Sequence, residues 1–176
     1  MLPTLLSGPA TTLRPARFSD GALLRAWRDQ PGFWCPQPSL DWPPGEERLE
    51  ASLHPSDGQR LLIVSPHDPH ASPHSFVVVS NLDWKNRGAV LAFGNASQND
   101  DPLLEALEVL ARFAYRELGL ERLESEVRAH DDRASHLLAA AGFTREAVKR
   151  QAARSGPLLA DSAVWARLRG DIRERA

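Results

Sequence analysis

The stretch from Gly94 to Leu120, GNASQNDDPLLEALEVLARFAYRELGL, decides the fold of this chain. Its second half repeats leucine and alanine every three or four residues, which predicts an amphipathic helix with one buried face. Gly119 suits the left-handed position after a last helical turn. The first half reads as a loop that enters this helix, and N–H groups at a helix start favour an anion. Asp100 and Asp101 lie at the start of this helix. Their negative charges raise the question of whether the loop can still bind an anion.

Length and composition indicate one globular domain with a hydrophobic core. The 176 residues are 42% hydrophobic and 25% charged, with a formal net charge of −2. A charge this small gives no overall attraction to nucleic acid or to an anionic membrane, so we predict neither as a partner. The N-terminal segment lacks the pattern of a signal peptide, and no apolar run is long enough for a membrane helix. We therefore predict a cytoplasmic protein.

Few residues in the chain are suited to metal binding. The single cysteine, Cys35, excludes an internal disulfide and any CxxC metal site. His67, His70 and His74 lie in one loop, but three prolines interrupt the regular spacing that a metal site on a helix would need. We predict no metal site.

The order of hydrophobic patterns and turn residues predicts seven strands and four helices. We expect strands over residues 13–16, 60–65, 76–82, 89–93, 122–128, 145–151 and 162–168. We expect helices from residue 19 or 20 to 28, over 45–53, from 102 to 118, and from a cap at Asp131 or Asp132 to the stop at Gly142. This order predicts an α/β (α+β) fold with a mixed, mostly antiparallel central sheet of about six to seven strands and about four helices. We divide the chain into a flexible arm (1–11), a single domain (12–170) and a tail (171–176).

Four segments resemble the GNAT superfamily of N-acyltransferases. Within it, the chain resembles the branch that acetylates the N-terminal alanine or serine of ribosomal proteins. The segments are LRPARFSDGALLRAW (13–27), EALEVLARFAYRELGLERLESEV (105–127), DRASHLLAAAGFTREAVKR (132–150) and the closing strand (161–168). The resemblance spans residues 12 to 168 and is weak between 30 and 75.

The resemblance implies a binding mode for acetyl-CoA as cofactor. The cofactor would lie between two splayed strands, here 89–93 and 122–128. The first strand, at Leu91, Ala92 and Phe93, would pair with the pantetheine amides. The pyrophosphate would rest on amides at the start of the central helix. An amine would then attack the thioester directly, without a covalent enzyme intermediate.

The loop of this chain departs from the family's glycine-rich motif. The two glycine positions fall on Asn99 and Asp101, and Gln98 could be the displaced polar residue that opens the motif. Asp101 followed by Pro102 predicts a helix cap that uses the amides a phosphate needs. An aspartate about 5 Å from a phosphate charge repels it by roughly 1 kcal/mol in water and about 3 kcal/mol at an effective dielectric of 20. Either the aspartates face solvent, or coenzyme A binding is weakened or lost.

Catalytic residues are implied at two positions. Ser135 matches the serine of the family's Asn-x-x-Ser signature, where it could donate a proton or hydrogen bond to the departing sulfur, or it could be an ordinary helix residue. Asp132 stands where that signature has asparagine, and we interpret it as a helix cap rather than a cofactor contact. No carboxylate occupies the usual position of the general base, and Asp83 is the nearest substitute, although a turn-forming aspartate is the alternative.

Trp34 and Trp42 are expected between the first two helices, a region that borders the acceptor site in this fold. They could bind the acceptor, a protein N-terminus or a small amine, or they could fix a proline-rich loop.

Two functions follow from these patterns. The first is an acetyl-CoA-dependent N-acetyltransferase. The second is a binding or regulatory protein of the same fold that has lost coenzyme A binding. A homodimer through the closing strands is compatible with both.

Overall fold

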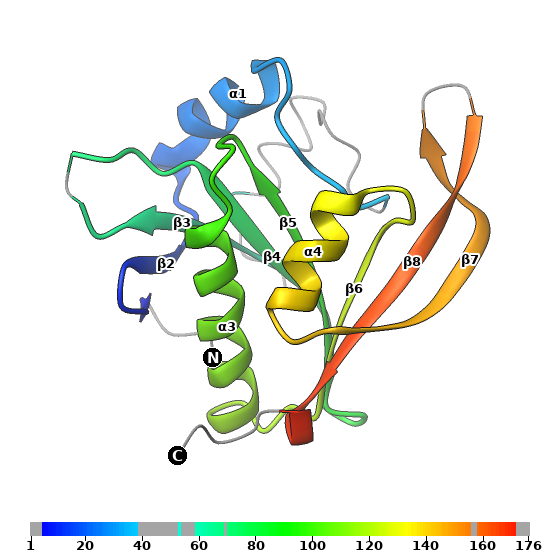
Figure 1. Ribbon diagram of the computed structural model, residues 1–176. Coiled ribbons are helices and arrows are strands. Elements are labelled where there is room, and N and C mark those ends of the chain that lie inside the picture. The colour runs from blue at the N-terminus through cyan, green and yellow to red at the C-terminus, as the bar shows by residue number, and fades with distance from the viewer. Residues whose placement is uncertain (1–4, 39–52, 54–58, 69, 156–157, 172–176) are drawn as a thin grey trace.

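A computed structural model describes residues 5–38, 53, 59–68, 70–155 and 158–171. One sheet of eight strands runs through the molecule in the order β1-β2-β3-β4-β5-β6-β8-β7. The helices α3 and α4 lie side by side on one face of the sheet, and the β7–β8 hairpin extends beyond the body (Figure 1). The predicted fold class is confirmed.

The strands follow the predicted ones closely and extend most of them by one or a few residues. They are β1 (Leu6–Ser7), β2 (Thr11–Pro15), β3 (Gln59–Pro66), β4 (Ser75–Asp83), β5 (Gly88–Asn95), β6 (Arg122–Arg128), β7 (Thr144–Ser155) and β8 (Leu158–Leu168). The described α-helices are α1 (Gly21–Asp29), α3 (Asp101–Arg116) and α4 (Asp132–Ala140). Short 3-10 helices precede α1 (Phe18–Asp20) and follow β8 (Arg169–Asp171).

The sheet has one strand more than the six to seven we predicted. The additional strand, β1, lies within the predicted arm, and its Leu6 pairs with Leu13 of β2. A two-residue strand is too short to show an alternating pattern, so the sequence gives no sign of it. The predicted helix over 45–53 lies outside the described residues, apart from Leu53.

The core is divided between the two faces of the sheet. The larger cluster packs against α3 and α4 and includes Leu91 and Phe93 of β5. The smaller cluster packs against α1 and includes Ala92. Alternate residues of β5 therefore serve opposite faces. No helix in the described residues is long and apolar enough to cross a membrane.

Strands β5 and β6 are the parallel neighbours in this sheet, and they pair over three residues before they separate. Their register runs from Gly88 with Arg122 to Val90 with Glu124. Beyond that point β6 continues to pair with β8, and β5 with β4. The two strands therefore leave an opening between residues 91–95 and 125–128, as the predicted splay requires.

An ion pair fixes the entry into α1. Both terminal nitrogens of Arg14 donate to the Asp20 carboxylate at 2.7 Å, and the backbone N–H of Arg17 donates to it at 2.7 Å. The hydrogen bonds from Arg14 hold the pKa of Asp20 below its usual value, against the opposing effect of burial.

We expect Asp20→Asn to destabilise the protein at pH 7 by about 2 kcal/mol, the value typical of a hydrogen bond to a charged group. The folded-state pKa lies below the unfolded one, so this stabilisation is present above the unfolded pKa and is lost as the pH falls through the folded pKa. Urea unfolding of both proteins between pH 7 and pH 3 measures the effect. The two stability curves should approach each other in acid; parallel curves would contradict the assignment.

Candidate functional site

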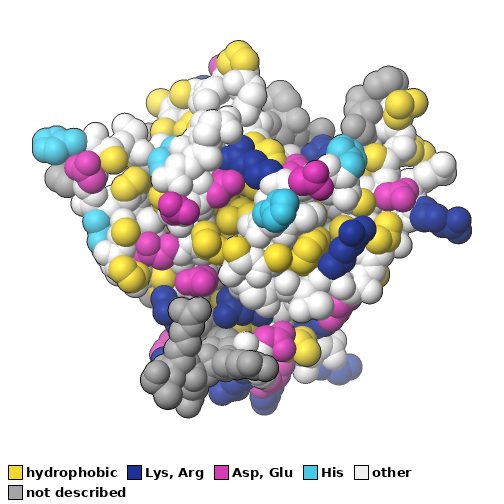
Figure 2. All heavy atoms as spheres, viewed as in Figure 1, with side chains coloured by type: hydrophobic (Ala, Val, Ile, Leu, Met, Phe, Trp, Pro, Cys, Tyr) yellow, Lys and Arg dark blue, Asp and Glu magenta, His cyan; other side chains and the backbone are white. Residues whose placement is uncertain are grey.

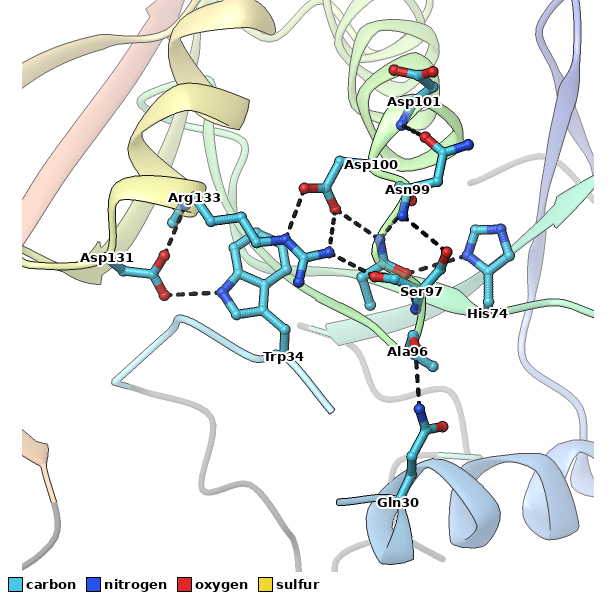
Figure 3. Close-up of polar contacts among 12 residues, drawn as sticks. Gln30, Trp34, His74, Ala96, Ser97, Asn99, Asp100, Asp101, Asp131 and Arg133 are labelled. Atoms are coloured by element: carbon cyan, nitrogen blue, oxygen red, sulfur yellow. Dashed lines mark hydrogen bonds and ion pairs between the residues drawn. The ribbon is translucent and has the colours of Figure 1, made fainter. Parts of the chain in front are cut away.

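The loop between β5 and α3 uses its own side chains to satisfy its backbone N–H groups (Figure 3). Asn95 Oδ1 accepts from the N–H of Ser97 at 2.8 Å, and Ser97 Oγ accepts from that of Asn99 at 3.0 Å. Asn99 Oδ1 accepts from the N–H of Asp101 at 3.0 Å. Three N–H groups near the start of α3 therefore already have acceptors.

The predicted helix cap is displaced by one residue. Helix α3 begins at Asp101, and Asp100 occupies the cap position without a capping hydrogen bond from its side chain. Asp101 is exposed, as are Gln98 and Asn99. Pro102 is compatible with the second helical position as well as the first, because neither N–H is needed within the helix. Of the two aspartates, only Asp100 turns toward the interior.

Asp100 forms a bidentate ion pair with Arg133, the second residue of α4 (Figure 3). Arg133 Nε donates to Oδ2 at 2.8 Å and Nη2 donates to Oδ1 at 2.7 Å. Nη2 also donates to the carbonyl of Ser97 at 2.6 Å, and Asn95 Nδ2 donates to Asp100 Oδ1 at 2.8 Å. An anion therefore does lie at the entrance of α3, and it is the chain's own carboxylate.

Trp34 lies against this ion pair and against the end of β5. Its backbone N–H and carbonyl exchange hydrogen bonds of 3.0 and 2.9 Å with Asn95. Its indole N–H donates to Asp131 at 2.9 Å, and the Arg133 guanidinium lies 4.2 Å from the ring centroid. The ring is 5.7 Å from that of Phe93. One side chain thus joins β5, α4 and the ion pair.

The residues after Trp34 continue across the opening to β6. The backbone N–H of Arg128 donates to the carbonyl of Pro36 at 3.1 Å, and its guanidinium donates to the carbonyl of Cys35 at 2.9 Å. We call residues 34–36 the strap, because they are bonded to β5 at one end and to β6 at the other. Burial raises the pKa of the Cys35 thiol to about 12.

Polar groups line the opening that the strap crosses. The backbone N–H and carbonyl of Asn95 point toward Trp34 and away from β4. Phe93 lies two residues earlier in β5, so its N–H and carbonyl also point away from β4, toward the opening. β5 pairs with β6 only as far as Val90, so these groups of Phe93 do not bond to β6. On the opposite wall, Ser125 of β6 is buried and its Oγ has no hydrogen-bond partner among the described residues. These groups are suited to a polar ligand.

The predicted pantetheine contacts are thereby refined. Leu91 and Phe93 have their backbone groups on the side of the opening, whereas those of the intervening Ala92 point toward β4, so the geometry favours Leu91 and Phe93 over Ala92 as backbone contacts. The reason is that backbone groups alternate between neighbouring strands along an antiparallel ladder. The sequence pattern alone did not establish which residues of β5 face β4.

Ser135 lies in the first turn of α4 and is half-buried. Its hydroxyl donates to the carbonyl of Asp131 at 3.0 Å. Asp131 is the cap of this helix, since its Oδ1 accepts from the N–H of Ala134 at 2.9 Å. Of the two predicted caps, Asp131 and Asp132, the structure therefore selects Asp131, and Asp132 is exposed at the first helical position.

Asp83 does not lie near the opening. Its carboxylate accepts from the N–H of Lys85 and of Asn86, both at 2.9 Å, in the turn between β4 and β5. It is paired with Gly88, at the end of the sheet where β5 and β6 are still joined. These hydrogen bonds support the turn-forming alternative, and a role for Asp83 as general base stays a prediction.

A carboxylate closer to the opening was missed in the sequence. Glu126 follows Ser125 on β6, and its side chain points away from α3 and α4 by strand alternation. Burial raises the pKa of Glu126, but hydrogen bonds from Lys149 and Ser162 outweigh this effect and lower it overall. A carboxylate held in its ionised form by two donors is a weak base.

No sequence pattern pointed directly to the residues that organise this site. Arg133 occupies a variable position of the Asn-x-x-Ser signature, and Asn95 is an ordinary strand end. Trp34 was predicted to border the acceptor site, whereas its ring packs on the side of α3 and α4. Trp42 lies outside the described residues.

An acetyl-CoA molecule fits part of this site. The backbone groups of Leu91 and Phe93 and the buried hydroxyl of Ser125 suit the amides and thioester of a pantetheine arm. The outer part of the path is filled by Trp34, and the expected pyrophosphate position holds the Asp100 carboxylate. Figure 2 shows acidic and basic side chains meeting on the surface near α3 and α4.

The strap is held by interactions of moderate strength. Five hydrogen bonds of about 0.5–1.5 kcal/mol each and a cation–π contact of about 0.5–2 kcal/mol give roughly 3 to 9 kcal/mol. A micromolar ligand binds with about 8 kcal/mol. Opening the strap would therefore consume a large part of a cofactor's binding energy.

No protein-family model and no curated protein sequence matches the chain. Solved structures do match. A chimera (K23-Q34) of the spermidine N-acetyltransferase SpeG from Vibrio cholerae and hSSAT superposes with a TM-score of 0.79 at 15% identity, over 94% of this chain and 99% of its own. The Vibrio cholerae spermidine N-acetyltransferase in complex with CoA and spermine superposes with a TM-score of 0.77 at 15% identity, over 92% and 96%. These likenesses establish the GNAT fold over nearly the whole chain.

Proposed function

We propose that this protein is an acetyl-CoA-dependent N-acetyltransferase that acts on an amine. The observation that carries the proposal is the opening between β5 and β6, toward which Phe93 directs its backbone groups and beside which Ser125 of β6 has a buried hydroxyl with no partner among the described residues. A small amine is the acceptor class we favour over a protein N-terminus, because two structural neighbours are a spermidine N-acetyltransferase and a chimera of it, the former in complex with CoA and spermine. The ribosomal-protein branch remains a prediction.

Acetyl-CoA would supply the acetyl group as an activated thioester. Leu91 and Phe93 would hold the pantetheine arm through their backbone groups, and Ser135 would donate a hydrogen bond to the departing sulfur. The amine nitrogen would form the new bond to the acetyl carbon as the carbon–sulfur bond breaks. With the Asp83 carboxylate engaged in its turn and Glu126 a weak base, the amine would have to arrive neutral or lose its proton to water.

We expect Ser135→Ala to lower kcat by about 100-fold, the lower range for a positioned proton donor, with little change in KM. The variant should keep its stability, because the hydroxyl is bonded only to a carbonyl within its own helix. Steady-state kinetics and urea unfolding test both parts. An unchanged kcat would assign Ser135 to the helix alone.

The proposal itself is tested by incubating the protein with acetyl-CoA and a panel of amines that includes spermidine, spermine and peptides with free N-termini. Thiol release is followed together with the mass of each amine. We expect a mass increase of one acetyl group on at least one acceptor. If thiol release matches spontaneous hydrolysis for every amine, and no acceptor gains mass, the proposal is wrong.

A second candidate function is favoured by the Asp100–Arg133 pair. If the carboxylate and the indole have permanently replaced the cofactor, the chain is a binding or regulatory protein of the GNAT fold. Failure of the transfer assay, with acetyl-CoA showing no heat of binding up to about millimolar concentration, would support it.

A further inference from the structure

We propose that Asp100, Arg133 and Trp34 form an internal latch that occupies the cofactor path and must open before coenzyme A can bind. This inference rests on the proposed function and concerns the regulation of the same site. In it, the Asp100 carboxylate takes the place of a phosphate and the Trp34 indole takes the place of part of the pantetheine arm.

Arg133 connects the two halves of the latch. Its guanidinium binds Asp100 through two nitrogens and stacks on Trp34 at the same time. A guanidinium binds phosphate in the same bidentate way as it binds carboxylate. Loss of the Asp100 charge would therefore free Arg133 for a phosphate and weaken its hold on the indole.

The path beneath the strap retains polar groups that the latch does not use. The hydroxyl of Ser125 is buried without a partner among the described residues, and Phe93 directs backbone groups toward the opening. Such groups are costly in a permanently filled interior. Their presence favours a strap that can move away from the opening, rather than one that is a permanent part of the core.

A cysteine within the strap can be used to detect its opening. Cys35 is the only cysteine in the chain, and it follows Trp34 directly. In the closed state its carbonyl is bonded to Arg128 and its thiol is poorly ionised. Release of the strap should expose this thiol, so alkylation of Cys35 measures opening independently of catalysis.

The binding experiment compares the wild type with Asp100→Asn, Trp34→Ala and the double variant by calorimetric titration with coenzyme A and with pantetheine, which has no phosphate. We expect Asp100→Asn to bind coenzyme A at least 10-fold more tightly with little effect on pantetheine. Trp34→Ala should tighten both ligands at least 10-fold. Trp84→Ala, at a tryptophan that is 58% exposed, is the matched control and should change neither affinity.

The labelling experiment follows alkylation of Cys35 by iodoacetamide with and without acetyl-CoA, which has no free thiol. We expect faster labelling in Asp100→Asn than in the wild type, and acceleration of the wild type by saturating acetyl-CoA. Trp34→Phe replaces Trp34→Ala if the latter does not fold.

The outcomes separate the latch from the proposed function. The latch is overturned if the folded variants bind coenzyme A no more tightly than the wild type. It is also overturned if the wild type binds with micromolar affinity and acetyl-CoA does not change the rate of Cys35 labelling. Variants that bind more tightly, yet acetylate no amine, support the latch and count against the N-acetyltransferase.

Discussion

Replacing Trp27 with alanine is expected to cost about 3–5 kcal/mol of folding free energy, the range for removing a buried aromatic side chain. Trp27 of α1 is 4% exposed, and its ring stacks on Phe33 at 6.0 Å and on Phe76 at 6.2 Å. Phe33 immediately precedes the strap, so the same cluster anchors α1 and the start of the strap. A loss of this size is a large part of the 5–15 kcal/mol that stabilises a typical domain.

Guanidinium unfolding of Trp27→Ala measures the loss. Trp84→Ala is the matched control, because the same atoms are removed from a side chain that is 58% exposed, and it should cost less than about 0.5 kcal/mol. Equal costs for the two variants would show that the aromatic cluster does not anchor α1. The stack of Trp27 with Phe33 joins α1 to the segment that precedes the strap, a contact that no local pattern predicts.

The fold was predictable because its signals are local. The leucine and alanine spacing of α3, the alternation in β6 and the β-branched run of β4 each predict an element without knowledge of the others. Gly119 and Gly142 adopt positive φ angles of 65° and 78°, as expected for glycines that follow helices. The two-residue β1 gave no such signal, because it is too short to show a pattern and its strand partner, β2, comes later in the chain.

The site was predictable only where it coincides with those elements. The sequence indicated that the loop before α3 lacks the glycines of the motif it resembles. In the structure, side chains of Asn95, Ser97 and Asn99 accept hydrogen bonds from the backbone N–H groups of this loop. The sequence did not indicate Arg133, because the partner of Asp100 lies 33 positions away in another helix. Nor did it indicate that Trp34 would face α3 and α4, since a proline-rich segment has no periodicity from which a direction can be inferred.

A double-mutant cycle on Asp100 and Arg133 is expected to give a coupling energy of about 1.5–3 kcal/mol, typical of hydrogen bonds between charged groups. Their side chains are only 27% and 25% exposed, so water screens the pair less than it would at an open surface. Arg133→Ala should cost more than Asp100→Ala, because it also removes the cation–π contact with Trp34. Unfolding free energies of the wild type, the two single variants and the double variant are needed.

The exposed pair of Glu121 and Arg169 provides the control cycle. Its atoms approach to 3.3 Å, but the side chains are 47% and 50% exposed, so a coupling below about 0.5 kcal/mol is expected. If Asp100 and Arg133 couple no more strongly than this pair, then the aspartate is a surface residue and the anion position at α3 is available to a phosphate. A coupling several times larger would mean that a phosphate must compete with a bound carboxylate. If the proposed function holds, the affinity for coenzyme A would then depend on the strength of this internal ion pair.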